Sequence, residues 1–107
     1  MPTSLLRGHV YRAKLGNTAP KFYLVVSNNR RNRALDDVLV IRLTTSEKPS
    51  IPSIVELGPS ERFTGRACCD DITWMSEDEV QEYLGALSPA AMRRIDAGLL
   101  AALGIQT

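Results

Sequence analysis

Two short apolar segments, residues 20–29 and 38–46, constrain the fold of this 107-residue chain more than any other feature. Both are short and rich in β-branched or aromatic residues, which predicts strands rather than helices. Lys21 opens the first strand and Thr44 closes the second. If the strands pair antiparallel, the start of the first lies beside the end of the second. The sequence therefore predicts a cation next to a hydroxyl at one sheet edge, a pair that can hold and polarise a phosphate.

The other segments predict further short strands and one long helix. Strands are expected at residues 7–15, 53–57 and 65–71, the last extended to residue 75 around a bend. Ser88 and Pro89 suit the start of a helix, and Gly104 suits its end. Because no linker or repeat interrupts the chain, residues 1–107 are expected to form a single domain. The order favours a mainly β fold with a C-terminal helix, built as a small, strongly bent antiparallel sheet or barrel.

Three local patterns carry expectations of their own. Ser76 and Glu79 have the capping-box spacing, which predicts a short helix that ends near Gly85. The polar, basic connection at residues 27–37 has room for one helical turn. Tyr11 and Trp74 are expected in the core. The alternative for Trp74 is stacking on a base or lining a subunit interface.

The charge is unevenly distributed along the chain, although the net charge is only +1. Residues 1–50 carry nine basic side chains against three acidic ones, whereas residues 51–107 carry four basic against nine acidic. A basic half favours a polyanionic partner. The alternative is that both halves are ordinary solvated surface.

Several classes of protein and site are not expected. No apolar stretch approaches the roughly 18 residues of a membrane span, and no secretion signal is visible at the N-terminus. Cys68 and Cys69 are adjacent, so on a strand they point to opposite faces and are poorly placed to pair. Such thiols suit a reducing cytoplasm, which is the expected location. His9 is the only histidine, so a metal site is not expected.

Five motifs in this order resemble the MazF/PemK family of toxin endoribonucleases. They are Arg7-Gly8-His9-Val10-Tyr11, residues 21–29, Leu43-Thr44-Thr45, Asp70-Asp71-Ile72, and the pair of segments 84–89 and 102–105. Together they cover nearly the whole chain. Most members have arginine at the position of Lys21 and a longer first loop. In these two features the chain resembles an actinobacterial branch of the family.

The resemblance implies an SH3-like barrel of five to seven strongly bent strands that forms a homodimer. It implies a sequence-specific endoribonuclease that cleaves single-stranded RNA without a metal or other cofactor. The family's catalytic pair, the basic residue opening the second strand and the threonine closing the third, carries over onto Lys21 and Thr44. The protein would then be an mRNA interferase, the toxin of a type II toxin–antitoxin system, with a small cognate antitoxin as its partner.

Candidate RNA-binding residues gather in the basic half. Arg42 shares a strand face with Thr44 by two-residue alternation, so it is a candidate second phosphate contact, with an ion pair as the alternative. An arginine-rich loop could follow the RNA backbone. The whole candidate set is Arg12, Lys14, Asn28, Arg30, Arg31, Arg33, Arg42, Thr45, Ser46 and Lys48.

Two other functions stay open on the same fold. One is a barrel that binds a protein target such as gyrase and cleaves nothing, and the other is an inactive dimeric binding module. Fold alone does not separate these functions. The basic first half and the retained Thr44-Thr45-Ser46 favour the ribonuclease. Lys21 in place of arginine loses bidentate phosphate recognition, which lends weight to the alternatives.

Overall fold

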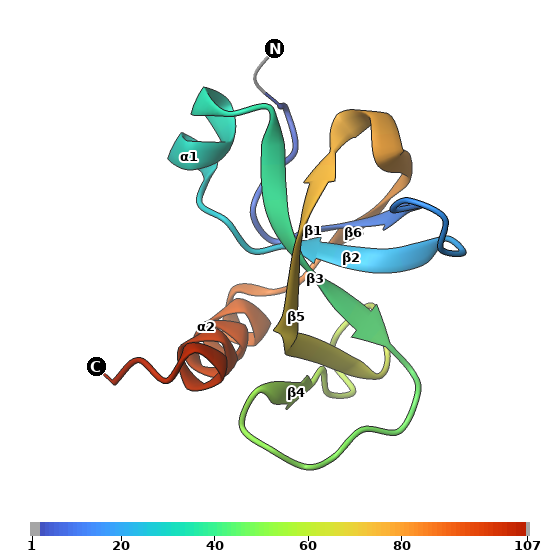
Figure 1. Ribbon diagram of the computed structural model, residues 1–107. Coiled ribbons are helices and arrows are strands. Elements are labelled where there is room, and N and C mark those ends of the chain that lie inside the picture. Colours follow the sequence, from blue (N-terminus) through green and yellow to red (C-terminus); the bar gives the residue numbers. More distant parts are fainter. Residues whose placement is uncertain (1–2, 107) are drawn as a thin grey trace.

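The computed structural model describes residues 3–106 (Figure 1). At its centre, strand β2 (Lys21–Val25) pairs antiparallel with strand β3 (Asp37–Thr44). The register places Phe22 opposite Leu43 and Val25 opposite Val40. The expected antiparallel pairing of the two apolar segments is therefore confirmed.

Four more strands extend this pair into a six-stranded sheet with the order β4-β5-β3-β2-β1-β6. All the pairings are antiparallel. The added strands are β1 (His9–Ala13), β4 (Ile54–Glu56), β5 (Arg66–Ser76) and β6 (Val80–Ala86). The mainly β architecture and the number of strands agree with the prediction. Because β4 and β6 do not pair with each other, the sheet is bent but does not close into a complete barrel.

Strand β5 bends sharply partway along its length (Figure 1). Its register with β3 shifts there, because Ile41 pairs with Ile72 whereas the next residue, Arg42, pairs with Cys68. The skipped residues form a bulge, which bends a strand and increases its twist. The sequence-based expectation of a strand that continues around a bend is confirmed.

The core consists of two clusters, and β3 contributes to both. Ile41 and Leu43 belong to one cluster, and Val38 and Val40 belong to the other. Side chains on a strand alternate between its two faces, and β3 is buried on both sides. Burial of both faces explains why the sequence of β3 is almost continuously apolar.

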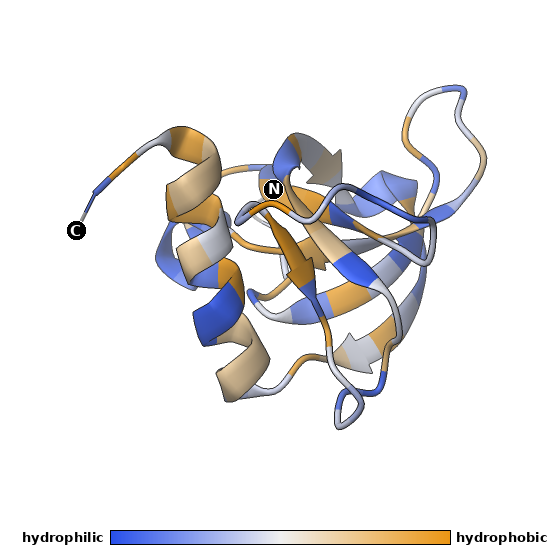
Figure 2. Cartoon of the chain, turned by 90° about the horizontal axis from the view of Figure 1, so that it is seen from below, coloured by the Kyte–Doolittle hydropathy of each residue, from blue (hydrophilic) through white to orange (hydrophobic). Residues whose placement is uncertain are grey.

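Helix α2 (Pro89–Leu103) covers the first core cluster and contacts β4 and β5. Figure 2 shows it beside the strands, with hydrophobic residues recurring along its length. The Ser88 hydroxyl accepts a hydrogen bond from the backbone N–H of Ala91 at 3.1 Å, and Gly104 ends the helix in the left-handed conformation. Both predicted ends of this helix are confirmed. No helix in residues 3–106 is long and apolar enough to cross a membrane.

The expectation of a short helix after Ser76 is wrong. Only a 3₁₀ turn forms, at Glu77–Glu79, and the chain then continues as β6. The capping contact itself is present, because Glu79 Oε1 accepts a hydrogen bond from the Ser76 backbone N–H at 2.9 Å. Pairing with the edge of β1 decides the outcome, since tertiary context overrides a local helix signal. Gly85, with φ of 136°, could not continue a helix.

The expectation that Trp74 lies in the core is also wrong. Trp74 is 69% exposed, whereas its neighbour Met75 is fully buried. The two residues point to opposite faces of β5, and only the Met75 face meets a core cluster. Tyr11 is buried as expected, in the same cluster as Met75. The alternative roles of Trp74, in stacking or at an interface, stay predictions.

Candidate active site

A cleft of about 460 Å³ opens where β2 begins and β3 ends. The strand ends contribute Lys21, Phe22, Arg42, Leu43 and Thr44, and the opposite side is residues 62–64. Because Phe22 pairs with Leu43, the adjacent residues Lys21 and Thr44 stand opposite each other across the ladder. The two residues that the sequence singled out therefore line one cleft.

The hydroxyl of Thr44 has a defined hydrogen-bonding state. Its oxygen accepts a hydrogen bond from the backbone N–H of Ser46 at 3.1 Å. A hydroxyl that already accepts keeps its own proton for donation, and the cleft is where an acceptor would meet it. Arg66 steadies the same segment by donating to the Ser46 carbonyl at 3.0 Å. Thr44 is thus arranged as a hydrogen-bond donor to a ligand in the cleft.

Gly65 brings a second piece of backbone against Thr44. A Cβ atom built on Gly65 would lie 2.2 Å from the Thr44 carbonyl oxygen, and the residue has φ of 97°. Both the close approach and the dihedral therefore require glycine. This contact fixes the distance between the end of β3 and the loop that forms the opposite wall of the cleft.

Arg42 brings an unpaired cation to the cleft. It stands opposite the buried Tyr23 in the β2–β3 register, and its Nε is buried without a hydrogen-bond partner. Burial raises the pKa of Tyr23, and the charge of Arg42 partly offsets that rise. Arg42 has no ion-pair partner in the described part of the chain. The ion-pair alternative is therefore not found in the described residues, and Arg42 lines the cleft as an unpaired cation.

The cleft has the charge of an anion site. Lys21, Arg42 and Arg62 line it, and none of the described residues that line it is acidic. Three cations that line one cleft attract an anion more strongly than the same charges spread over open surface. A phosphodiester has the charge that this arrangement would neutralise.

Sequence reasoning missed the opposite wall of the cleft. Residues 62–64 lie in the connection between β4 and β5, and the ring of Phe63 meets that of Phe22 edge-on, with centroids 6.4 Å apart. A loop has no periodicity to place it, so nothing local brings Phe63 next to Phe22. The available signal was the neighbouring pair Arg62-Phe63, a cation and an aromatic side by side in an irregular segment.

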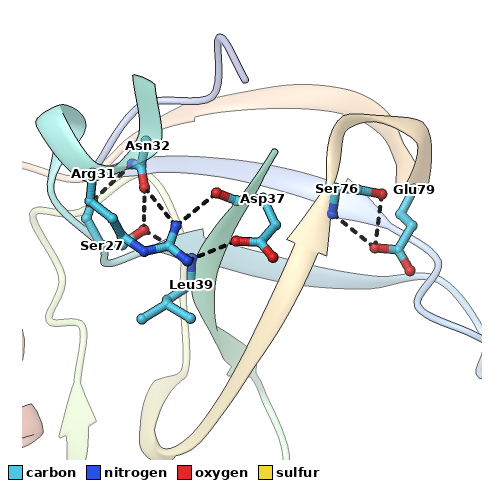
Figure 3. Close-up of polar contacts among 7 residues, drawn as sticks. All are labelled: Ser27, Arg31, Asn32, Asp37, Leu39, Ser76 and Glu79. Atoms are coloured by element: carbon cyan, nitrogen blue, oxygen red, sulfur yellow. Dashed lines mark hydrogen bonds and ion pairs between the residues drawn. The ribbon is translucent and has the colours of Figure 1, made fainter. Parts of the chain in front are cut away.

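Two predicted RNA contacts have structural roles at helix α1 (Asn29–Ala34), and Figure 3 shows one of them, Arg31. Arg31 donates to the carboxylate and to the backbone carbonyl of Asp37, both at 2.7 Å, and so ties the helix to β3. Asn28 caps the helix by accepting from the Arg31 backbone N–H at 2.8 Å. Asn32 is buried beneath them and exchanges hydrogen bonds with Ser27. These contacts already engage both terminal nitrogens of the Arg31 guanidinium.

The remaining candidates are dispersed over the surface. Thr45 lines the cleft, and Ser46 follows it on the loop after β3. Arg12 pairs with Glu82 on β6. Exposed side chains outside the lining of the cleft are Lys14, Arg30, Arg33 and Lys48. The structure thus brings Lys21, Arg42, Thr44 and Thr45 together in one cleft and places the other basic candidates outside its lining.

Both cysteines lie outside the lining of the cleft. Cys68 and Cys69 are buried and free, and burial raises the pKa of Cys69 to about 12. A thiol of that pKa is protonated at neutral pH and inert as a nucleophile. No group of three or more histidine, cysteine, aspartate or glutamate residues in 3–106 is placed to hold a metal ion.

The comparison with known families decides what kind of protein carries this cleft. The profile of the family described as "PemK-like, MazF-like toxin of type II toxin-antitoxin system" matches residues 6–103. The chain belongs to this family. The expected resemblance is therefore confirmed over nearly the whole sequence.

Two characterised relatives lie close to this MazF-like protein. Endoribonuclease MazF1 of Mycobacterium bovis is 47% identical over 100 residues, which cover 94% of this chain and 93% of the relative. Endoribonuclease MazF4 of Mycobacterium tuberculosis matches at the same identity and coverage. Both relatives carry the name of an RNA-cleaving enzyme.

Solved structures of similar proteins share the fold. An endoribonuclease in complex with its cognate antitoxin, from a Mycobacterial species, superposes with a TM-score of 0.89. It is 44% identical, and the match covers 97% of this chain and 99% of that one. A MazE–MazF structure from Deinococcus radiodurans has a TM-score of 0.77 at 17% identity, covering 95% of this chain and 97% of that one. The second likeness shows the fold alone.

The wall of the cleft in this MazF-like protein is anchored to helix α2. Glu61 accepts a hydrogen bond from the Ser88 hydroxyl at 2.6 Å and one from the Ser88 backbone N–H at 3.0 Å. Arg94 of the same helix donates to the carbonyls of Glu56 and Leu57, just before the loop. The loop that carries Arg62 is therefore held to α2 where it leaves β4 and again at Glu61.

Acidification is expected to loosen this anchor. The hydrogen bond from the Ser88 hydroxyl, followed by that from its backbone N–H, lowers the pKa of Glu61 below the ordinary 4.5. A carboxylate with a lowered folded pKa stabilises the fold at higher pH, and its contribution is lost as pH falls through the folded pKa. The melting temperature should therefore fall between about pH 5 and pH 3, and less so in Glu61→Gln.

The control for this titration is Glu47→Gln, because the Glu47 side chain is 94% exposed. Hydrogen bonds from Ser4 also lower the pKa of Glu77, so part of the acid-dependent fall persists in every variant. An identical pH profile of the melting temperature in wild type and Glu61→Gln would show that the anchor contributes nothing.

Proposed function

We propose that this chain is a sequence-specific, metal-independent endoribonuclease that cleaves single-stranded RNA as the toxin of a type II toxin–antitoxin system. The observation that carries the proposal is the placement of Lys21 and Thr44 in one cationic cleft. Membership of a family whose similar members are named endoribonucleases supports it. We assign residues 1–107 to a single toxin domain.

The reaction proposed is attack of a ribose 2′-OH on the adjacent phosphate. The 2′-OH loses its proton as the 2′-O–P bond forms, and O5′ takes up a proton as the P–O5′ bond breaks, so the products are a 2′,3′-cyclic phosphate and a free 5′-OH. Charge builds on the phosphate oxygens as the attack proceeds. The Lys21 ammonium stabilises that charge, and the Thr44 hydroxyl donates a hydrogen bond to a phosphate oxygen. A preorganised donor and cation cost no reorganisation at that moment.

Further cations are proposed to bind the RNA backbone. Arg42 is the best placed, because it lines the cleft and its Nε has no partner. Thr45 lies beside it in the cleft. Exposed residues farther out, assigned to weaker backbone contacts, are Lys14, Arg30, Arg33, Ser46 and Lys48. Arg12, Asn28 and Arg31 are assigned to folding, because each already has a partner within the chain.

Replacing Arg42 tests the backbone contact. Arg42→Gln keeps most of the side-chain volume and removes the charge, so RNA affinity is expected to fall about fivefold or more, and the slope of log affinity against log salt by about one. Arg93→Gln is the matched control, an exposed arginine of α2 outside the lining of the cleft. Equal salt slopes for wild type and Arg42→Gln would contradict the assignment.

The experiment that tests the function is incubation of the purified protein with labelled single-stranded RNA in EDTA. We expect cleavage with 5′-OH and 2′,3′-cyclic phosphate ends at a restricted set of sequences. Mapping the RNA ends also identifies the preferred sequence. No cleavage of any RNA would return the alternatives, a gyrase-binding barrel or an inactive dimeric module, neither of which has a specific observation in its favour.

The partners proposed beside RNA are a second copy of the chain and a small cognate antitoxin. One similar endoribonuclease is solved with its cognate antitoxin. An acidic antitoxin segment would complement the three cations of the cleft and block it. The cytoplasm is the proposed location, because two adjacent free thiols suit a reducing compartment.

A further inference from the structure

The cleft has an apolar side that phosphate chemistry does not use. Phe22 and Phe63 both line it, and their rings meet edge-on with an interplanar angle of 81°. Phe22 is 40% exposed although its two successors on β2, Tyr23 and Leu24, are buried. An aromatic ring left open at the edge of a cationic cleft has the character of a stacking surface for nucleobases.

The two rings differ in how they are held. Phe63 is partly buried and packs against the first core cluster, so its ring is fixed in place. Phe22 belongs to neither core cluster and points from the start of β2 into the cleft. One ring is therefore a rigid wall, and the other offers an open face beside Lys21 at the phosphate site.

Arg62 lies next to these rings on an unusual support. A Cβ atom built on Gly85 of β6 would lie 3.1 Å from Arg62 Nη1 and 3.2 Å from its Cδ. The arginine side chain thus rests on bare backbone, where any larger residue would displace it. In the described part of the chain Arg62 has no ion-pair partner. Arg62 is also among the residues that line the cleft, so it adds a charge there that no described carboxylate pairs with.

We propose that Phe22 and Phe63 form a nucleobase-stacking subsite next to the phosphate site, and that Arg62 binds the phosphate on the far side of the stacked base. This inference rests on the proposed function, because it adds a base contact to the same cleft. A cleft of about 460 Å³ has room for a base as well as a phosphate. The base would meet the aromatic rings, and the phosphate would meet the cations. The subsite places one base of the substrate and so contributes to sequence preference.

The test couples a ring to a base. The probe is a fluorescent single-stranded oligonucleotide of mixed sequence with 2′-deoxyribose throughout, which cannot be cleaved by 2′-OH attack, together with copies in which each position in turn is abasic. Anisotropy gives the affinities. Phe22→Leu and Phe63→Leu are expected to weaken binding of the intact probe by about 5- to 100-fold. On the probe whose abasic position removes the stacked base, that loss should shrink to about twofold or less, as a double-mutant cycle requires.

Controls separate stacking from other effects. Phe63→Tyr keeps an aromatic ring and should keep the affinity, even if Phe63→Leu loses some core packing. Tyr83→Leu replaces an aromatic residue that is 53% exposed but lies outside the lining of the cleft, and it should bind as wild type does. Arg62→Gln should weaken intact and abasic probes equally, because a phosphate contact does not depend on the base.

Two results would overturn the subsite. One is wild-type affinity in both leucine variants, and the other is an undiminished loss at every abasic position. Its failure is distinguishable from failure of the proposed function. If the leucine substitutions couple to an abasic position but no RNA is cleaved, the proposed function fails and the subsite stands. If RNA is cleaved without that coupling, the subsite fails and the proposed function stands.

Discussion

Thr44→Ala is expected to lower the rate of single-stranded RNA cleavage by about 10²- to 10³-fold, the usual cost of removing one hydrogen-bond donor to developing transition-state charge. The reason is local. The Thr44 oxygen already accepts from the Ser46 N–H, so the role left to the hydroxyl is donation into the cleft. Binding of uncleavable RNA should change little, because the cations that attract the backbone are intact. The measurement is single-turnover cleavage in EDTA beside anisotropy.

Two variants make this result specific. Thr44→Ser restores the hydroxyl and should recover most of the rate. Thr73→Ala removes an exposed threonine of β5 outside the lining of the cleft and should cleave as wild type does. Equal cleavage by Thr44→Ala and wild type would place the site elsewhere on the protein. Lys21→Met should give a loss comparable to that of Thr44→Ala if the ammonium stabilises the same charge.

Gly65→Ala is expected to reduce stability and cleavage together. The added Cβ would lie 2.2 Å from the Thr44 carbonyl oxygen, and φ of 97° strains any residue with a side chain. Strain and displacement together should cost about 2–4 kcal/mol of unfolding free energy, or a drop of about 10 °C or more in melting temperature. Because the displaced atoms belong to Thr44, the folded fraction should also cleave more slowly.

Gly16→Ala is the matched control. Gly16 also has a positive φ, of 60°, but nothing lies within 4 Å of its added Cβ. It therefore shows the conformational cost of alanine alone, about 1–2 kcal/mol, with no effect on the rate per folded molecule. If Gly65→Ala behaved like Gly16→Ala in both melting and cleavage, the close approach to Thr44 would have no consequence for the site.

The half of the cleft that carries Lys21 and Thr44 was predictable from the sequence, because its information lies in two strands and their pairing. Two apolar segments define β2 and β3, their pairing is antiparallel, and Lys21 and Thr44 mark the ends that must meet. The helix at the C-terminus was predictable for the same reason, since Ser88 and Gly104 are signals within its own segment. Each of these features depends on one element and its immediate partner.

The rest depended on contacts that no local pattern encodes. The segment after Ser76 begins with a helix-capping pattern, yet it forms strand β6 because it pairs with the free edge of β1. Trp74 has the size of a core residue but falls on the face of β5 that no cluster covers. Residues 62–64 reach the cleft only because Gly65, Glu61 and Arg94 hold their loop there. The ion pair between Arg31 and Asp37 likewise has no signal in the sequence pattern, which groups Arg31 with the exposed arginines of the same segment.

The bulge divides β5 into two stretches. In each stretch, which side chains face a hydrophobic cluster is independent of the other stretch. Before it, Ala67 points into the cluster beneath α2, and after it, Met75 points into the other cluster. A single continuous ladder would lock the two choices together through strict alternation. Because the skipped residues lie between them, the two stretches of this one strand contribute to two different hydrophobic clusters. A chain of this size can therefore build two clusters with six strands.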